Sequence, residues 1–491
     1  MDYLSLSRAA RLAGVTRAEL QARIRRGEIP TFEGAVAVND LLRAYPSVSL
    51  ANDDALERTT RIKALAHPRF HAGGGETTLP DPEVLLSRLQ GLSAGLADRA
   101  ARLESATELL DQIGEQVDEL CRLPRGQLEE SLLALRDWLR GERARLAAEA
   151  NPDQRAQLIV KDAFLRLMAA NVKLIPSGHD FFVEGNESIL EASVRAGLTL
   201  NYGCSSGNCG GCKARVVSGE TWRLREHDYV ISEREKAMGY ILTCSHTAVT
   251  DLVLEAAEAN RAEDLPYQEI RASLRKLERL GPDLVALSIQ TPRTQTLRFM
   301  AGQRALLTLE SGESRELPIA SCPCNGRHLW FYVRRQADAF SEAVFGGLRP
   351  GQLVTASGPL GDFVLRDEAS EPAIFIAHGD GIAPIKSLIE HAVSIDHIES
   401  FQLYWDTPYP EAHHQAQWGR ALRDALDNFG FTPLVSGRVE DLMALIRADL
   451  TEPTGARFYV AGPAESVRAT RAALLVLGVE AERIATEETA T

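Results

Sequence analysis

The 491-residue sequence has no uninterrupted apolar run near the ~18 residues that a membrane-spanning helix needs. Its first residues, Met-Asp-Tyr-Leu-Ser-Leu, lack the basic start and the apolar core of a secretory signal peptide. Positive charge is in deficit, because 54 Lys and Arg stand against 68 Asp and Glu, for a net charge of −14. These features predict a cytoplasmic protein with no membrane partner, and the negative charge opposes general nucleic-acid binding by the whole chain.

Cysteine is scarce too, with seven residues in the whole chain. Four of them form the pattern C-x4-C-x2-C followed by a distant fourth cysteine: Cys204, Cys209, Cys212 and Cys244. The three others are expected to be ordinary reduced thiols rather than a second metal site: Cys121, Cys322 and Cys324. The sulfur chemistry of the chain is therefore expected to centre on the stretch at residues 201–212.

Four thiolates are the ligand set of a [2Fe–2S] cluster, with two sulfurs on each iron. Glycines crowd the same stretch, and they allow the positive φ angles and the close N–H···S approaches that a cluster loop needs. A tetrahedral zinc site is the main alternative, but zinc sites usually show two C-x2-C pairs and this chain has one. A disulfide framework is disfavoured because nothing in the sequence indicates secretion.

The motif and its flanks resemble a plant-type ferredoxin domain across residues 172–258. The flanking matches are a helix start at 189–192, the Leu-Thr-Cys approach at 242–244 and a closing strand near 252–254. The resemblance implies a β-grasp fold at residues 171–260 and one-electron transfer. It also implies that the four cysteines of the pattern are the cluster ligands.

The first 45 residues predict two short helices near 4–13 and 18–26, a β-wing at 28–38 and a last helix. This pattern resembles the winged helix-turn-helix of the excisionase and MerR-like group. The arginines around the second, recognition-type helix are Arg17, Arg23, Arg25 and Arg26. Seven Arg and five acidic residues give residues 1–45 a net charge of only +2. DNA contact and protein docking are therefore both open for this module.

Residues 46–81 predict a linker that contains three consecutive glycines. Residues 82–170 predict helices, because apolar residues recur at alternating steps of four and three between Leu85 and Leu120. That period indicates a coiled-coil seam. A parallel coiled-coil homodimer and an antiparallel hairpin within one chain both fit the pattern, and we favour the homodimer.

The remainder of the chain shows two patterns. Residues 261–368 contain short alternating strands separated by Gly and Pro, which predicts a small β-barrel. Residues 369–491 alternate strands with helices, which predicts a parallel α/β sheet. The turn His-Gly-Asp-Gly at 378–381 follows the first strand, where a helix N-terminus is suited to a pyrophosphate.

These two blocks resemble the ferredoxin-NADP reductase superfamily, specifically reductases that carry an N-terminal plant-type ferredoxin. Benzoate dioxygenase, methane monooxygenase and CDP-6-deoxy-3,4-glucoseen reductases are of this kind. The matching segments are R-E-L-P-I-A-S at 315–321, F-S at 340–341, G-P-L-G-D-F at 358–363, G-D-G-I-A-P at 379–384, Y-V-A-G-P at 459–463 and the terminal acids Glu487 or Glu488. The expected fold class is multidomain α+β, with helix-turn-helix and coiled-coil helices, a β-grasp ferredoxin, a β-barrel flavin domain and an α/β nucleotide-binding domain.

The resemblance implies FAD and NADH as cofactors besides the [2Fe–2S] cluster. A hydride passes from nicotinamide to FAD, and single electrons pass to the cluster and on to a partner oxygenase or dehydratase component. The implied cofactor-binding residues are Arg315, Leu317, Pro318, Ser341, Gly379, Gly381, Pro384 and Gly462. Asp406, with no Arg in the segment after the second strand, favours NADH over NADPH.

Several positions depart from the family pattern at the chemistry. Leu317 replaces the aromatic residue that stacks on flavin, and Pro318 replaces a serine that lies near its N5. Asp380 stands in the nucleotide loop, where a carboxylate repels pyrophosphate unless a neighbour neutralises it. His378 would do so only if it were protonated, and Ala461 replaces a late cysteine. The alternative function is a redox-responsive regulator or electron-carrier scaffold with a degenerate reductase module.

Overall fold

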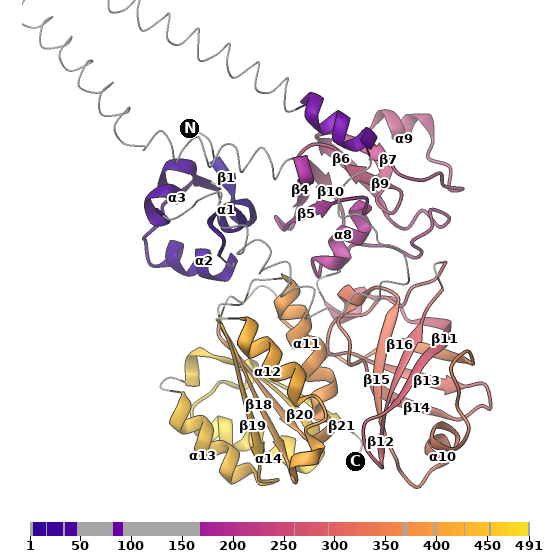
Figure 1. Cartoon of the computed structure of the whole chain (residues 1–491), viewed down its shortest axis with the longest axis vertical. Coiled ribbons are helices and arrows are strands. Elements are labelled where there is room, and N and C mark those ends of the chain that lie inside the picture. The colour runs from indigo at the N-terminus through magenta and orange to yellow at the C-terminus, as the bar shows by residue number, and fades with distance from the viewer. Residues whose placement is uncertain are drawn as a thin grey trace, which may run out of the picture.

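The computed structural model describes residues 3–46, 82–91 and 167–489, with short gaps at 16, 33–34, 260, 293, 367–370, 396–397, 399, 427 and 451–452. The predicted linker at 46–81 lies almost wholly outside these residues, as does most of the predicted coiled coil. In the described part of the chain, no helix combines the length and the apolar character needed to cross a membrane. Four folded units are visible in Figure 1.

The N-terminal unit consists of short helices around a small sheet of strand order β1-β3-β2. Its elements are β1 (Tyr3–Ser5), α1 (Leu6–Ala13), α2 (Arg17–Arg25), β2 (Thr31–Phe32), β3 (Ala35–Ala37) and α3 (Val38–Ala44). Leu12, Leu20 and Leu41 are fully buried where the three helices meet. Helices and a strand pair therefore lie where the sequence predicts them.

A short helical stretch at 82–91 is the described start of the predicted helical region. Its buried side chains are Val84 and Arg88, while Leu89 of the predicted seam is exposed. Arg88 donates hydrogen bonds to the Ala248 carbonyl at 2.8 Å and to the Leu167 carbonyl at 3.1 Å. This stretch therefore packs against the unit that begins at residue 167.

That second unit is a mixed sheet of order β5-β4-β10-β6-β8, with a helix packed on it and a two-stranded β7-β9 ribbon. Its elements are β4 (Ala169–Ile175), β5 (Asp180–Glu184), α8 (Ile189–Arg195), β6 (Lys213–Ser218), β7 (Thr221–Arg223), α9 (Glu233–Ala237), β8 (Tyr240–Leu242), β9 (His246–Ala248) and β10 (Leu252–Glu255). The capping box between Ser188 and Glu191 starts α8 where the sequence expects a helix. The first and last strands, β4 and β10, pair in parallel at the centre, as a β-grasp fold requires.

The barrel unit is a six-stranded antiparallel sheet of order β14-β13-β16-β11-β12-β15. Its elements are β11 (Gln268–Arg279), β12 (Leu284–Gln290), β13 (Arg304–Leu309), β14 (Ser314–Pro318), η2 (Pro323–Asn325), β15 (His328–Arg334), α10 (Ala339–Gly346) and β16 (Leu353–Leu360). Arg315 of β14 donates to the Arg334 carbonyl of β15 at 3.0 Å. The two edge strands thus approach each other, and the sheet nearly closes around one apolar core.

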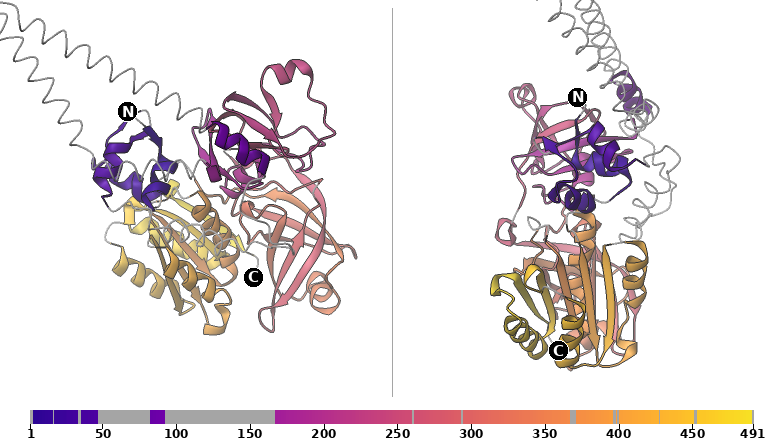
Figure 2. Two further views of the ribbon diagram at one scale, coloured as in Figure 1. Left: turned by 45° about the horizontal axis from the view of Figure 1, so that its top comes forward. Right: turned by 90° about the vertical axis from the view of Figure 1, so that its left-hand side faces the viewer.

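The C-terminal unit is an all-parallel sheet of order β19-β18-β17-β20-β21. Its elements are β17 (Ala373–His378), η3 (Gly379–Gly381), α11 (Ile382–Ile395), β18 (Phe401–Thr407), α12 (Ala416–Ala425), β19 (Phe429–Val435), α13 (Val439–Asp449), β20 (Arg457–Pro463), α14 (Ala464–Val476) and β21 (Ile484–Thr489). Helices cover both faces, as Figure 2 shows from two further sides. Residues of β17 alternate between the two cores, with Phe375 on one face and Ile374 and Ile376 on the other.

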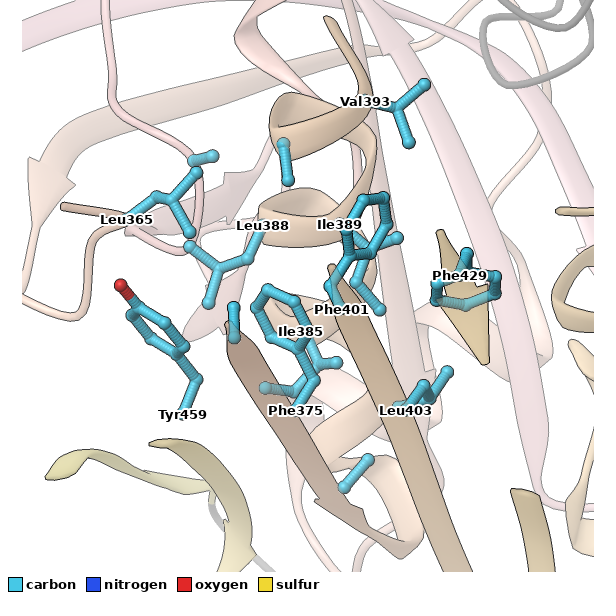
Figure 3. Packing of buried hydrophobic residues seen from close by; sticks show 14 of the residues in the cluster. Leu365, Phe375, Ile385, Leu388, Ile389, Val393, Phe401, Leu403, Phe429 and Tyr459 are labelled. Atoms are coloured by element: carbon cyan, nitrogen blue, oxygen red, sulfur yellow. The ribbon is translucent and has the colours of Figure 1, made fainter. Parts of the chain in front are cut away.

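One of these cores, drawn in Figure 3, joins the barrel unit to the C-terminal unit. Leu365, from the segment that leaves the barrel, packs in the same cluster as Phe375 and Leu388. The rings of Phe375 and Tyr459 stack at 5.2 Å, and the Tyr459 hydroxyl accepts a hydrogen bond from the Arg366 amide. Strand order reverses between β17 and β20, so the switch point of the sheet lies beside this core.

Candidate functional site

The four motif cysteines come together at one end of the β-grasp sheet. Cys204, Cys209 and Cys212 lie on the loop between α8 and β6, and Cys244 follows β8. Cys209 is exposed, whereas the other three are buried. Gly207 and Gly210 in this loop have φ angles of 84° and 73°. A Cβ atom on Gly210 would lie 2.3 Å from the Tyr229 ring, so a glycine is needed there.

The thiols form two pairs rather than a single tetrahedral group. The neighbouring Cys212 and Cys244 thiols shift each other's pKa in opposite directions, and Cys209 lowers the pKa of Cys204. In the part of the chain that the structure describes, no three His, Cys, Asp or Glu side chains converge on one metal ion. Two pairs suit a cluster with two sulfurs per iron better than one tetrahedral zinc ion.

Backbone amides of the loop point at these sulfurs. The Gly211 amide donates to Cys209 Sγ at 3.3 Å, and the Gly207 amide helps to lower the pKa of Cys244. The hydrogen bond from the Cys212 thiol, with these further donors, lowers the pKa of Cys244 to about 6, although burial opposes the shift. Thiolates are the metal-binding form of cysteine, so donor set, glycines and amides all fit a [2Fe–2S] cluster.

Arg298 links the cluster loop to the barrel. It follows β12 in the chain, and its Nη2 donates to Asn201 Oδ1 at 2.8 Å. Its guanidinium also lies 5.6 Å from the centre of the Tyr202 ring. Burial raises the pKa of Tyr202 to about 12, so its hydroxyl stays protonated at neutral pH. The sequence motifs gave no indication of this contact, because Arg298 lies 97 residues from Asn201.

Two of the expected flavin residues meet at the N-terminus of α10. Arg315 donates to Ser341 Oγ at 2.8 Å. Between them lies Asp338, which sequence analysis did not single out: its Oδ1 accepts from the Ser341 amide at 2.8 Å, and it forms an ion pair with Arg315. The hydrogen bond from Arg315 lowers the pKa of Asp338. The Arg and the helix N-terminus fit a phosphate, but the Asp338 carboxylate already lies between them.

The other two expected flavin residues lie at the end of β14. Leu317 is buried in the barrel core, so it presents no stacking ring. Pro318 pairs in register with Arg304 and has no N–H to offer. The expected flavin residues therefore offer polar groups to a flavin phosphate but only apolar surface to the flavin ring system.

The expected nucleotide residues gather at the switch point of the parallel sheet. Gly379 has a φ angle of 54°, and a Cβ on Gly381 would lie 2.1 Å from the Ala461 carbonyl oxygen. Gly462 has a φ angle of 150°, and a Cβ there would lie 2.6 Å from His378 Cβ. Pro384 lies in the first turn of α11, which begins at Ile382. The glycines thus allow the loop and β20 to touch.

The charge of Asp380 is balanced from the barrel. Arg334 of β15 forms two hydrogen bonds with this carboxylate, one of them from Nη2 to Oδ1 at 2.7 Å. His378 does not meet the condition of being protonated, because burial lowers the pKa of its imidazole to about 4 and keeps it neutral. With Arg334 in place, Asp380 no longer presents an uncompensated negative charge to a dinucleotide.

Asp406, which the sequence offered in favour of NADH, is buried and already hydrogen-bonded within the protein. It is 3% exposed, and its Oδ1 accepts hydrogen bonds from the amides of Ser436 and Gly437 at 3.1 Å and 3.0 Å. The inference from Asp406 to NADH therefore fails, since this carboxylate already caps the loop after β19. The segment at 405–410 still contains no Arg for the 2′-phosphate of NADPH.

Of the two terminal acids, Glu487 is the one that is buried. It is 6% exposed on β21, and Arg304 of the barrel lies 3.1 Å from its Oε1. Burial raises the pKa of Glu487 to about 7, because the pairing with Arg304 only partly offsets it. Glu488 is exposed. Of the two candidates, Glu487 is the one at the boundary between barrel and C-terminal unit.

Known proteins match the cysteine-bearing region and the reductase-like region together. A model of the 2Fe-2S iron-sulfur cluster binding domain matches residues 172–249. The CDP-6-deoxy-L-threo-D-glycero-4-hexulose-3-dehydrase reductase of Yersinia pestis is 32% identical over 273 residues, which cover 55% of this chain and 81% of the relative. The reductase component of propane 2-monooxygenase from a Gordonia strain is 27% identical over 256 residues, or 51% of this chain and 74% of the relative.

Among solved structures, the Amycolatopsis cytochrome P450 reductase GcoB superposes with a TM-score of 0.42 at 24% identity, covering 65% of this chain and 98% of that one. The matched 2Fe-2S domain lies within the unit that carries the four motif cysteines, and the two relatives are named as a reductase and as a reductase component. The chain belongs to the family of the CDP-6-deoxy-L-threo-D-glycero-4-hexulose-3-dehydrase reductases.

Proposed function

We propose that this chain takes electrons from NADH and delivers them one at a time through its cluster to a separate acceptor protein. The observation that carries the proposal is that Cys244 after β8 lies beside the three cysteines of a loop that Arg298 ties to the barrel. FAD, when bound, accepts a two-electron hydride and releases single electrons, which matches a one-electron cluster. Cys204, Cys209, Cys212 and Cys244 are the proposed ligands.

The proposed flavin and nucleotide contacts follow from charge and shape. Arg315 and the N-terminus of α10 would bind flavin phosphate once Asp338 releases Arg315. Gly379, Gly381 and Gly462 leave room for the dinucleotide beside Pro384, and Arg334 balances Asp380 there. Leu317 and Pro318 lie where the flavin ring is expected, and they supply only apolar contact.

The proposal is tested by the cofactor content of the full chain purified without added flavin. Iron, acid-labile sulfide and released flavin are measured per chain, and NADH is then added without oxygen. Two irons, one flavin and bleaching of the cluster absorbance support the reductase. The alternative function, an electron-carrier scaffold, would be supported instead by two irons, no flavin even after reconstitution with FAD, and no response to NADH.

The acceptor is proposed to be an oxygenase or dehydratase component. The similar proteins include both a dehydrase reductase and the reductase component of a monooxygenase. NADH-dependent reduction of a purified dehydratase, compared with a monooxygenase hydroxylase component, distinguishes the two classes. The cytoplasmic location and the homodimer expected from sequence belong to the same proposal, and light scattering of the full chain tests the dimer.

For the N-terminal module, one set of contacts favours docking over DNA binding. Arg8 donates to both carboxylate oxygens of Asp251, at 2.7 Å and 3.1 Å. Arg17, from the helix expected to read DNA, pairs with Asp180 at 2.7 Å. Arg11 lies 4.6 Å from the centre of the Phe182 ring. We therefore propose that this module docks on the ferredoxin domain of its own chain.

Arg23 of α2 and Arg26, directly after this helix, have partners inside the module. Arg23 donates to the Ala44 carbonyl and lies over the Tyr45 ring, and Arg26 pairs with Glu28. DNA fragments flanking the gene, titrated with the full chain in each redox state, test the alternative. Binding that Arg23→Ala with Arg25→Ala abolishes would restore the DNA-reading role, whereas no binding in either state supports docking.

A further inference from the structure

The cysteines outside the cluster motif include a bonded pair. Cys322 and Cys324 form a disulfide, so the expectation of reduced thiols is wrong for these two; Cys121 lies outside the described residues. The pair brackets Pro323 at the start of η2, directly after the segment that carries the expected flavin residues. Cys322 is 1% exposed, and Cys324 is half-buried.

Helix α11 of the C-terminal unit holds this pair in place. Glu390 accepts a hydrogen bond from the Cys322 amide at 3.1 Å. His391 Nδ1 lies 3.9 Å from Cys322 Sγ, and the Ser394 hydroxyl donates to Cys324 Sγ at 3.3 Å. Each sulfur thus has a polar side chain of α11 beside it, and these two groups can exchange or stabilise protons.

The ferredoxin domain covers the same place from the other side. A Cβ on Gly197, at the end of α8, would lie 3.0 Å from His391 Cε1 and 2.7 Å from Ile395 Cγ2. Helix α8 and η2 are neighbours in space, and Figure 1 shows α8 above α11. The disulfide therefore lies where barrel, C-terminal unit and ferredoxin domain meet.

A structural role accounts poorly for this bond. A disulfide stabilises a fold mainly by shortening the loops of the unfolded chain, and the gain falls as the closed loop becomes smaller. Here the bonded residues are only two apart in sequence. Two sulfurs with adjacent imidazole and hydroxyl groups are better explained as a reactive centre.

We propose that Cys322 and Cys324 form a thiol–disulfide exchange site whose substrates are dithiols. A thiolate of the dithiol attacks Cys324 Sγ, the Cys322–Cys324 bond breaks, and Cys322 leaves with its proton supplied through His391. The second thiolate of the dithiol then attacks its own mixed disulfide and releases Cys324, which takes up a proton. The dithiol is oxidised to its disulfide while the cysteine pair gains two electrons and two protons.

The test uses the full chain with its cluster, kept anaerobic, and dithiothreitol as the probe. Free thiols are blocked with one alkylating reagent at timed intervals, and remaining disulfides are reduced and labelled with a second reagent before peptide mass spectrometry. We expect the 322–324 peptide to open in the native chain and to close again with oxidised dithiothreitol. A peptide that is already reduced, or one that opens only after unfolding, overturns the proposal.

Three variants assign the roles. His391→Gln should slow opening about 100-fold, the low end of the loss expected for one proton-transfer group. His413→Gln is the matched control, because that ring contacts Thr407 and the Trp405 carbonyl instead of a sulfur. Cys322→Ser should form a mixed disulfide with glutathione disulfide through Cys324, and equal opening rates in both histidine variants would remove His391 from the mechanism.

Discussion

Arg298 of the barrel donates a hydrogen bond to Asn201, three residues before the first cluster cysteine, at a distance of 2.8 Å. The same guanidinium lies over the Tyr202 ring next to it. A charge-assisted hydrogen bond of this kind orients as well as attracts. It therefore holds the loop that carries the cluster thiols against the unit expected to hold flavin.

Replacing Arg298 by alanine should slow electron delivery through the cluster. Loss of one charge-assisted hydrogen bond costs about 1 kcal/mol, or roughly a fivefold drop in the docked population. We expect cytochrome c reduction by NADH to fall by that factor, while ferricyanide reduction directly from flavin is unchanged. Arg271→Ala on the exposed face of β11 is the control, and an equal loss in both assays would point to damaged flavin binding instead.

Iron content should separate the two classes of cysteine. Cys209→Ser removes one member of the Cys204–Cys209 pair, so the cluster should be lost or should release iron much faster. Cys324→Ser should keep its iron, because that sulfur belongs to the disulfide beside α11. Iron and sulfide assays on both variants check this, and full iron content in Cys209→Ser would refute the ligand assignment.

Removing the charge of Asp338 should tighten flavin binding. Asparagine keeps the hydrogen bond that caps α10 but gives up the ion pair with Arg315, which is then available to phosphate. We expect the Kd for FAD to fall about tenfold, equivalent to ~1.4 kcal/mol. Glu342→Gln, an exposed change of the same charge in the first turn of α10, is the control. Equal tightening in both variants would mean that only overall charge matters.

Glu487 should make stability depend on pH in a defined direction. Its pKa is raised to about 7 in the folded chain, so the folded state holds a proton that the unfolded state has released. The contribution of Glu487 to the free energy of unfolding is fully present below the ordinary carboxyl pKa, and it is lost as the pH rises through about 7. Between pH 5 and pH 8, the free energy of unfolding of Glu487→Gln should therefore rise relative to that of the native protein by on the order of 2 kcal/mol.

Urea unfolding followed by the fluorescence of tryptophan, including the buried Trp405, measures that difference at the two pH values. The exposed neighbour Glu488, changed to Gln, is the control. A constant difference between Glu487→Gln and the native chain at both pH values would show that Glu487 titrates normally.

Hydrogen exchange should report the docking of the N-terminal module. Arg8→Ala leaves Asp251 without its bidentate partner, so amides of α1 should exchange faster by a factor of roughly 5 to 100, for a lost contact of about 1–3 kcal/mol. Arg43→Ala is the control, because Arg43 is exposed and pairs only locally with Asp40. Unchanged exchange in α1 would mean that the module is not held by this contact.

Local patterns predicted the elements well where one segment contains the whole signal. The parallel strands of the C-terminal unit and the two helices of the N-terminal module lie where periodicity places them. Helix α11 starts at Ile382, directly after the predicted turn, and it includes Pro384 because proline is tolerated in a first helical turn. The predicted coiled coil is mostly outside the described residues, and only its beginning can be compared.

Partners of charged residues could not be predicted in this way. The sequence offered only a protonated His378 as a neighbour able to neutralise Asp380, yet the partner is Arg334, 46 residues earlier. Arg17 looked like a DNA-reading residue, and it pairs with Asp180 of another domain. Asp406 looked available to a ribose, and it is buried under the loop after β19.

The sequence by itself determined the cluster loop, because three thiols and the glycines that allow its backbone turns lie within nine residues and need no distant information. It also determined the order of folded units through the period of apolar residues. Only the tertiary structure decided which charges meet, which carboxylates are buried and which cysteines are bonded. Those outcomes depend on distances between units far apart in the chain, and Coulomb and hydrogen-bond energies fall steeply with distance in space rather than in sequence.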